Sequence, residues 1–260
     1  MARRLRGSRR RDAPALHVLS AFASKLGAVI ADRVVEPGQN EIMAAVALLK
    51  DLPLDGAIIT GDAIFTQREI CRRIRGANGH YLFVVKENQP TLKADLKLAF
   101  GDVSPSEGPP PDARTAATLD KGHGRIETRK ITVSSEVVDY LDWPGLAQVA
   151  RIDRRRRIGE KESVEVGYLI TSLPATDAGP ERLLDLARAH WAIENKLHYV
   201  RDVTFREDRC RVRAGARPLA TLRSLATSLI RSLGLHIPEA RENFREERAA
   251  AIAAVTGSIL

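Results

Sequence analysis

Hydrophobic positions in the first part of the chain switch between a strand period of about two residues and a helical period of about 3.6. Residues 16–35 hold two β-rich runs that flank residues 24–27, a pattern typical of a hairpin. Residues 40–52 follow with apolar residues at helical spacing behind Asn40, a residue type that favours the N-cap position. These segments predict a hairpin and then a helix.

Strands and helices are expected to alternate from there to residue 100. Residues 56–60 form a continuous apolar run that ends at Gly61 and Asp62, as a buried parallel strand does. We expect a helix over 66–79, a strand over 80–86 and a helix over 91–100. This alternation predicts an α/β protein whose strands form a mixed sheet with flanking helices.

The character of the sequence changes after residue 100. Residues 101–125 are rich in Pro, Gly and Ser and predict a surface linker. Three strands are expected over 127–138, 147–157 and 162–173, which together make a β-rich insertion. From Pro180, a residue suited to a first helical turn, helices are expected over 180–200 and 218–234. A charged, alanine-rich tail follows residue 236.

Composition narrows the class of protein. The chain has 260 residues, of which 44% are hydrophobic, enough to fill a large core or two smaller ones. No apolar run reaches the roughly 18 residues of a membrane helix, and the basic start leads into no apolar signal core. Cys71 and Cys210 give no disulfide framework. We therefore expect a cytoplasmic globular protein.

The charge is positive and clustered. The formal net charge is +8, which favours polyanionic partners such as nucleic acid, although a solvated basic surface has the same composition. Three segments concentrate the arginines: residues 1–11, residues 154–157 and residues 201–217. This clustering favours the nucleic-acid interpretation.

Asp62 is the first candidate for chemistry. It comes directly after an expected buried strand, where side chains at the carboxyl edge of a sheet reach a shared crevice. The alternative is structural, because an aspartate at this position also caps a following helix.

Glu194 is the second candidate. On one continuous helix it would lie beside the buried stripe, with His190, His198 and Arg201 along the same strip. Such a carboxylate either binds a metal ion or forms an ordinary ion pair with its neighbours. The spacing of His190, Glu194 and His198 also permits a zinc site.

Four separated blocks carry a family resemblance: residues 60–70, 80–92, 123–129 and 190–213. In this order they resemble the H-repeat-associated group of bacterial insertion-sequence transposases, over nearly the whole chain. The resemblance implies an RNase H-like fold interrupted by a β-rich insertion, with a catalytic triad of two aspartates and a glutamate. It implies cleavage and transfer of DNA strands with two Mg²⁺ (or Mn²⁺) ions held by the carboxylates.

The resemblance also assigns regions and partners. Residues 1–100 would be the N-terminal part of the core, 101–179 the linker and insertion, 180–235 the C-terminal helical part of the core and 236–260 the tail. The partner would be double-stranded DNA, at transposon ends and in the target, bound by a homodimer in a synaptic complex. The location would be the bacterial cytoplasm, in association with the nucleoid and with no membrane.

Residue by residue, Asp62 takes the second carboxylate position of the family and Glu194 the third. In the wider class of transposases, Tyr, Arg and Lys surround this glutamate, where this chain has Ala187, His190 and Arg201. The loss of the tyrosine puts the role of that position in doubt. The residues expected to contact DNA phosphates are His190, Asn195, Lys196, His198, Arg201, Arg154, Arg155, Arg156, Arg157, Arg206, Arg209, Arg211 and Arg213.

The first aspartate of the family has no counterpart. Family members carry Asp-Gly-Lys-x-x-Arg-Gly-Ser, and residues 6–8 match its end, which places Met1 where the aspartate stands. The strand that carries this aspartate is expected to lie before the chain begins. Asp12 and Asp32 are not favoured as substitutes, because metal ligands need near-fixed geometry. We therefore expect weak Mg²⁺ binding, no strand transfer by this chain alone, and unpaired strand edges around residues 16–22 and 57–60.

Two further functions remain open from the sequence. One is a DNA-binding remnant of a transposase that lacks catalysis. The other is a nuclease of the same fold that cuts DNA without depending on transposon ends. Nucleotide hydrolysis is not expected, because the chain has no glycine-rich phosphate loop.

Overall fold

The structure is a computed structural model, and it describes residues 2–5, 8–9, 15–102, 108–122, 124–190, 193–212 and 215–257. The chain divides into two compact units. One combines residues 1–48 with 189–260, and the other comprises residues 49–188.

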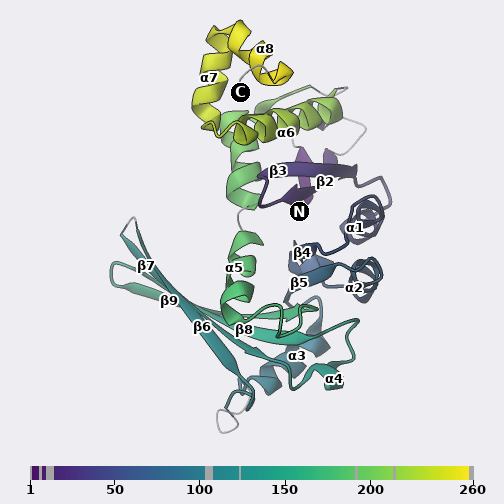
Figure 1. Cartoon of the computed structure of the whole chain (residues 1–260), viewed down its shortest axis with the longest axis vertical. Helices are drawn as coiled ribbons and strands as arrows, with labels where there is room; N and C mark the ends of the chain where they lie inside the picture. Colours follow the sequence, from purple (N-terminus) through teal and green to yellow (C-terminus); the bar gives the residue numbers. More distant parts are fainter. Residues whose placement is uncertain are drawn as a thin grey trace. The chain divides into compact units, whose positions relative to one another are not determined.

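The unit of residues 49–188 is built on a six-stranded sheet with the order β4-β5-β9-β8-β7-β6 (Figure 1). β4 and β5 pair in parallel, and the remaining pairs are antiparallel. The strands are β4 (Ile58–Gly61), β5 (His80–Val85), β6 (Arg114–Gly122), β7 (Arg125–Ser134), β8 (Gln148–Ile158) and β9 (Lys161–Thr171). The predicted α/β class with a mixed sheet is thus confirmed, and β4 is the expected parallel strand.

Helices connect and cover these strands. They are the 3₁₀ turn η2 (Ala63–Phe65), α2 (Arg68–Arg75), α3 (Pro90–Ala99), α4 (Val138–Leu141) and α5 (Pro180–His190), whose last two residues belong to the other unit. α3 and α5 each begin at a proline, which lacks the N–H that a first helical turn leaves unpaired anyway. α2 ends before Gly76, whose N–H donates to the Arg72 carbonyl.

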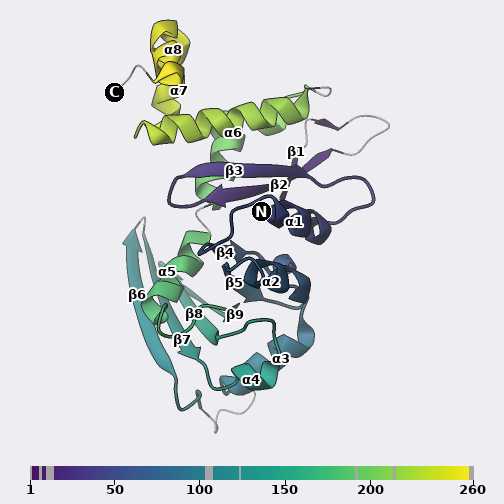
Figure 2. The same ribbon diagram turned by 45° about the vertical axis from the view of Figure 1, so that its right-hand side comes forward.

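The core lies between α5 and one face of the sheet, which we call the α5 face. α5 lies over this face (Figure 2). Its Leu183 and Leu184 are fully buried against side chains of the sheet. The sheet residues of this cluster are Leu82, Ile131, Val133, Ala150 and Leu169. Because side chains alternate along a strand, the neighbouring Tyr81 and Phe83 point to the opposite face. There the Tyr81 hydroxyl donates a hydrogen bond to the Pro144 carbonyl at 2.9 Å.

The predicted linker contains a strand. Residues 114–122, inside the segment for which we expected a surface linker, form β6 and pair with β7 from Arg114↔Val133 to Gly122↔Arg125. Few residues of β6 are apolar, so its own sequence gives little strand signal, and its pairing with β7 is what makes it a strand. The three strands expected after it are confirmed as β7, β8 and β9.

The other unit contains a three-stranded antiparallel sheet in the order β1-β2-β3. Its strands are β1 (Ala2–Leu5), β2 (Leu16–Ala23) and β3 (Ala28–Val34). The predicted hairpin is confirmed, and Gly27 in its turn has a φ of 65°, which glycine adopts without strain. The helix α1 (Glu41–Lys50) starts as expected, with the Asn40 side chain accepting a hydrogen bond from the Met43 N–H at 2.9 Å.

The expected unpaired edge on β2 is wrong over Leu16–Leu19. Residues 2–5 form a strand that pairs there, from Leu5↔Leu16 to Ala2↔Leu19. β1 lies at one edge of its own sheet, and β4 lies at one edge of the six-stranded sheet with β5 as its neighbour.

Helical segments complete this unit. They are η3 (Glu194–His198), η4 (Val200–Thr204), η5 (Glu207–Arg209), α6 (Ala216–Ser232), α7 (Ile237–Glu246) and α8 (Arg248–Thr256). α6 is tied to the hairpin, since the Val29 N–H donates to the Ser228 hydroxyl at 3.3 Å and the Arg231 guanidinium to the Gly27 carbonyl at 2.9 Å. Among the described residues, none of the helices combines the length and apolar character that crossing a bilayer requires.

The α5 face gives a test of the core. We expect Leu183→Ala to lower the free energy of unfolding by about 2–5 kcal/mol, because it opens a cavity between α5 and the sheet. Urea denaturation measures the change. Leu98→Ala on α3 is the control, since Leu98 is 53% exposed and its truncation should cost little. Equal losses in the two variants would contradict this account of the core.

Candidate functional site

Asp62 lies where the two parallel strands end. β4 and β5 run side by side from Ile58↔His80 to Gly61↔Phe83, so the residues that follow them emerge at the same edge of the sheet. The Asp62 side chain is 41% exposed. Its Oδ1 accepts a hydrogen bond from the Ala63 N–H at 3.1 Å and so caps η2. The structural alternative for Asp62 is therefore confirmed, and it leaves the carboxylate accessible to a ligand.

Gly61 allows this strand end to pack closely. A Cβ atom on Gly61 would lie 3.0 Å from Phe83 Cε1 and 3.2 Å from Phe65 Cδ2. Glycine therefore lets the two aromatic rings close over the backbone directly before Asp62. This packing fixes the point from which the carboxylate projects.

The loop after β5 holds the loop after β4. The Asn88 side chain donates to the Ala63 carbonyl at 2.6 Å, and the Gln89 side chain donates to the Thr66 carbonyl at 2.8 Å. The Thr66 hydroxyl in turn donates to the Val84 carbonyl at 2.6 Å. These bonds tie the first residue of η2 and the residue that follows η2 to the neighbouring strand and its loop.

Lys86 adds a positive charge at this edge. Its Nζ lies 3.9 Å from Asp62 Oδ1, and both side chains are largely in contact with solvent, so the pair stabilises the fold little. The sequence interpretation did not assign Lys86, Asn88 or Gln89 to the site. The sequence signal that could have found them is the polar run directly after the apolar strand over 80–86. This strand is parallel to the strand that precedes Asp62.

Glu194 lies in a segment that is not the expected α-helix. α5 ends at His190, residues 191 and 192 lie outside the described residues, and η3 and η4 have π-helical geometry. Hydrogen bonding from i to i+5 widens each turn, so side chains four residues apart no longer line up as in an α-helix. The predicted continuous α-helix over 180–200 is therefore wrong over Glu194–His198, which is π-helical.

The two predicted catalytic carboxylates belong to different units. Asp62 is part of residues 49–188, whereas Glu194 is part of the other unit. The Glu194 and Asn195 side chains lie outside the described part of the structure, as do Met1, Asp12 and Arg213. Asp32 lies within β3, opposite Ser20. The convergence of Asp62 and Glu194 thus stays a prediction.

The side chains that the structure describes contain no group of three or more His, Cys, Asp or Glu residues that could hold a metal ion. The zinc alternative depends on the undescribed Glu194 side chain, between His190 at the end of α5 and the buried His198. It stays untested.

Arg201 is buried and paired instead of exposed to a ligand. Only 1% of it is accessible, and its guanidinium donates to both carboxylate oxygens of Glu207, Nε to Oε2 at 2.8 Å and Nη2 to Oε1 at 3.1 Å. Arg223 of α6 donates to the same carboxylate at 3.2 Å. The expected phosphate contact of Arg201 is therefore corrected to a buried ion pair that joins η4 and η5 to α6.

The other predicted contacts of this unit are distributed along its surface. Lys196, Arg206, Arg209 and Arg211 are exposed, and His190 is partly buried. The Lys196 carbonyl accepts a hydrogen bond from the Arg231 guanidinium, which ties the π-helical segment to α6. The exposed side chains remain candidates for phosphates.

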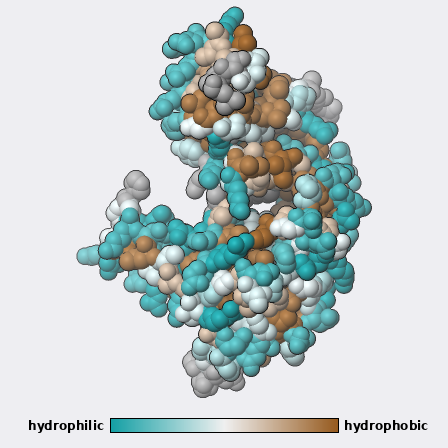
Figure 3. All heavy atoms as spheres, in the orientation of Figure 1, coloured by the Kyte–Doolittle hydropathy of each residue, from teal (hydrophilic) through white to brown (hydrophobic). Residues whose placement is uncertain are grey.

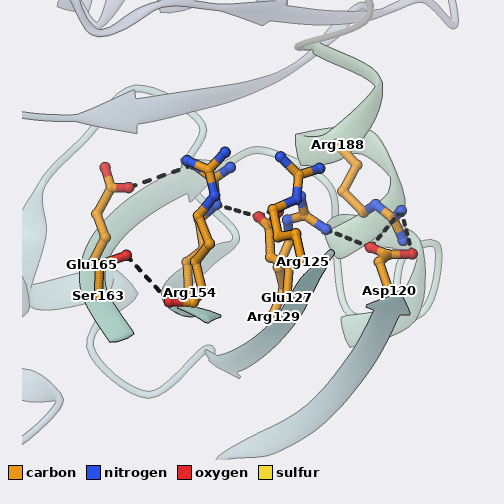
Figure 4. Close-up of polar contacts among 9 residues, drawn as sticks. Asp120, Arg125, Glu127, Arg129, Arg154, Ser163, Glu165 and Arg188 are labelled. Carbon is orange, nitrogen blue, oxygen red and sulfur yellow. Dashed lines mark hydrogen bonds and ion pairs between the residues drawn. The ribbon is translucent and has the colours of Figure 1, made fainter. Parts of the chain in front are cut away.

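The four consecutive arginines of β8 divide between the two faces of the sheet. Arg154 and Arg156 follow Ala150 and Ile152 onto the α5 face, whereas Arg155 and Arg157 point to the opposite side. Arg154 hydrogen-bonds to Glu127 and lies 3.6 Å from Glu165 (Figure 4). The run is therefore not one uniform basic patch.

Glu127 is the centre of a charged network on the α5 face. It is 1% exposed, and its carboxylate pairs with Arg154, with Arg129 at 2.6 Å and with Arg125 at 3.6 Å (Figure 4). Asp120 extends the network by pairing with Arg129 at 2.6 Å and with Arg188 of α5 at 3.0 Å. Burial alone would raise the pKa of the Glu127 carboxyl, but these guanidinium groups together lower it.

The sequence matches one family model and several known proteins. A family model described as "Transposase DDE domain" matches residues 4–230. "Putative protein YbfL" and "H repeat-associated putative transposase YhhI" of Escherichia coli strain K12 are each 35% identical to it over 234 residues, which are 86% of this chain and 60% of either relative. "Putative transposase YncI" of Escherichia coli O157:H7 is 32% identical over 84% of this chain and 56% of the relative. The chain thus spans about 60% of the length of these relatives.

The buried ion pair between Arg201 and Glu207 gives a prediction about stability. We expect Glu207→Gln to lower the free energy of unfolding by about 3–5 kcal/mol, because it leaves the buried guanidinium without its counter-charge. Urea denaturation followed by circular dichroism measures the loss. Glu242→Gln on the exposed side of α7 removes the same charge and should change stability little. A variant at Glu207 as stable as this control would contradict the structural role.

The lowered pKa of Glu127 gives a dependence on pH. A carboxyl whose pKa falls on folding stabilises the protein above its ordinary pKa of about 4.3, and this contribution is lost as the pH drops through the folded-state value. We expect the acid-induced loss of stability to be smaller in Glu127→Gln than in the wild type.

Urea midpoints measured from neutral to acidic pH test this expectation. Glu165→Gln is the control, because the Glu165 side chain is 75% exposed and should leave the pH dependence as it is. Parallel pH curves for the wild type and Glu127→Gln would show that this carboxyl is not responsible.

Proposed function

We propose that this chain, which belongs to the transposase DDE domain family, cleaves and joins DNA strands at the ends of an insertion sequence. The family model covers residues 4–230, and the resemblance to the H-repeat-associated group is confirmed. The mixed α/β structure is consistent with the RNase H-like fold of transposases. Membership in the family implies DNA binding and a requirement for a divalent metal ion in general.

The position of Asp62 is the observation that supports the proposal most. It follows a parallel strand at the carboxyl edge of a mixed sheet. Its side chain caps the turn η2, and its carboxylate stays accessible to solvent. This is the edge at which open α/β sheets bind their ligands. Glu194 is proposed as the partner carboxylate, on the strength of its place in the matched family motif.

The donor chemistry of Asp62 fits the proposed metal. Carboxylate oxygens are the ligands that Mg²⁺ and Mn²⁺ prefer, and the 41% exposed side chain has room for one. When bound, two such ions activate a water or a 3′-hydroxyl and stabilise the leaving oxygen at phosphorus. The chain's own contribution is to orient Asp62 through η2 and the Asn88 and Gln89 contacts, and to present the Lys86 ammonium to a phosphate.

Finer features of the proposal come from the family alone. They are a homodimer in a synaptic complex, recognition of transposon ends and target DNA, and association with the nucleoid. A DNA-binding remnant and an end-independent nuclease are the competing functions.

Asp62→Asn tests the proposed role of the carboxylate. The amide keeps the shape of the side chain and can still cap η2, but it removes the negative charge that a divalent ion needs. We expect gel-shift binding to duplex DNA to persist, and Mn²⁺ binding, measured by paramagnetic resonance, to weaken at least about tenfold. Asp55→Asn is the control, because Asp55 is an exposed carboxylate before the other end of β4.

The same proteins separate the three functions when strand cleavage is measured with and without transposon ends. Cleavage that requires the ends and is lost in Asp62→Asn supports the transposase. Cleavage of any duplex indicates the nuclease, and binding without cleavage in all proteins indicates the remnant. Unchanged Mn²⁺ binding in Asp62→Asn would remove Asp62 from the metal site.

A further inference from the structure

Beyond α5, the strands β6 to β9 continue as an arm, which we define as residues 117–122, 125–130, 153–158 and 161–166 (Figure 1). The antiparallel registers of the arm contain no bulge, so the alternation of side chains is unbroken along each strand. One side of the arm continues the α5 face and contains the Glu127 network. The opposite side we call the outer face.

The outer face concentrates exposed cations. Lys130 on β7 alternates with the inward Ile131, and Arg155 and Arg157 alternate with Arg154 and Arg156. Lys121 on β6 shares a cross-strand row with Arg157, through Ile126 of β7. All four cations are exposed.

The cations of the two faces differ in their partners. On the α5 face, Arg125, Arg129 and Arg154 are engaged by Glu127. On the outer face, Lys121, Lys130, Arg155 and Arg157 form no ion pair with any residue that the structure describes. Two acids share this side, Asp153, which pairs with Arg151 at 2.8 Å, and Glu162, which lies opposite Arg157 in the register. The positive charge of the outer face is therefore largely uncompensated.

Apolar side chains lie between these cations. Leu119 and Val164 are each 58% exposed and share one cross-strand row with Arg155, and Val166 is 41% exposed in the next row. The space-filling view in Figure 3 likewise shows a hydrophobic patch within a mostly hydrophilic surface on the arm. Such a mixed surface suits a partner that has both charged and uncharged groups.

Charge decides between the possible occupants. A second copy of this chain in a two-fold interface would bring the same patch against itself and place these cations face to face, which is unfavourable. Double-stranded DNA presents a regular array of negative phosphates joined by uncharged sugars. We propose that the outer face of the arm is a docking surface for the phosphate backbone of double-stranded DNA, through Lys121, Lys130, Arg155 and Arg157.

This inference rests on the proposed function and divides the Arg154–Arg157 run, since only Arg155 and Arg157 contact DNA. Arg154 instead pairs with Glu127 in the charged network on the α5 face, and Arg156 faces the same side. The arm thus binds DNA through alternate residues of β8, while Arg154 between them joins β8 to Glu127 of β7 and Glu165 of β9.

The salt dependence of DNA affinity tests the docking surface. The probe is a duplex of arbitrary sequence, and its binding to the whole chain is measured by fluorescence anisotropy from about 50 to 200 mM salt. Arg155→Thr with Arg157→Thr keeps a residue type that favours strands, and we expect it to flatten the slope of log affinity against log salt by about 1.8, or about 0.9 for each contact. Lys121→Thr with Lys130→Thr on the neighbouring strands is an independent second variant with the same expectation.

Two further variants make the result specific. Arg72→Ala with Arg73→Ala removes two exposed charges from α2 in the same unit and should leave the slope unchanged. Arg155→Lys with Arg157→Lys keeps the charges and should restore it. Melting temperatures confirm that each variant is folded, and light scattering follows the oligomeric state.

The outcomes are distinguishable from failure of the proposed function. If the wild type binds no DNA, both proposals fall. The docking surface is overturned, while DNA binding stands, if the wild type binds DNA but the outer-face variants keep its salt slope. The same holds if their slope flattens no more than that of the α2 variant. A changed oligomeric state with an unchanged slope would show that the face binds a second copy instead.

Discussion

The parallel pairing of β4 with β5 is the constraint on which the candidate site depends. Because both strands end at one edge, the residues after β5 lie within reach of the turn after β4 and hold it through Asn88 and Gln89. Gly61 allows Phe65 and Phe83 to pack against the strand end, so the backbone of Asp62 has little freedom. A carboxylate held in this way is positioned before any ligand binds, which spares a binding reaction the cost of ordering it.

The second constraint is electrostatic and lies in the β arm. The arginines of these four strands would repel one another if all their guanidinium groups lay on one face without an acidic partner. Glu127 prevents this on the α5 face, where a buried carboxylate receives three guanidinium groups and Asp120 connects the network to α5. The pairing of strands and the pairing of charges thus support each other, and the outer face is left positive.

Local patterns in the sequence were sufficient for much of the fold. Patterns among neighbouring residues predict the hairpin, the N-cap at Asn40, the parallel strand before Asp62 and the strands β7 to β9. The structure confirms these predictions. β6 was missed because its strand character comes from β7 and not from its own composition. The π-helical turns after His190 were missed because an α-helical spacing of apolar residues does not reveal a wider turn. Arg201 was misassigned because its partner, Glu207, reaches it only through that altered path of the chain.

The four arginines of β8 have the same residue type, but their roles differ because successive residues of a strand point to opposite faces of the sheet. Loss or gain of one residue within the strand would exchange the two sets, and would bring Arg155 and Arg157 toward Glu127 while it turned Arg154 and Arg156 outward. Substitutions inside the arginine run are therefore tolerated differently at successive positions, whereas a change in its length is penalised at all of them, so relatives of this chain should vary in the composition of β8 before they vary in its length.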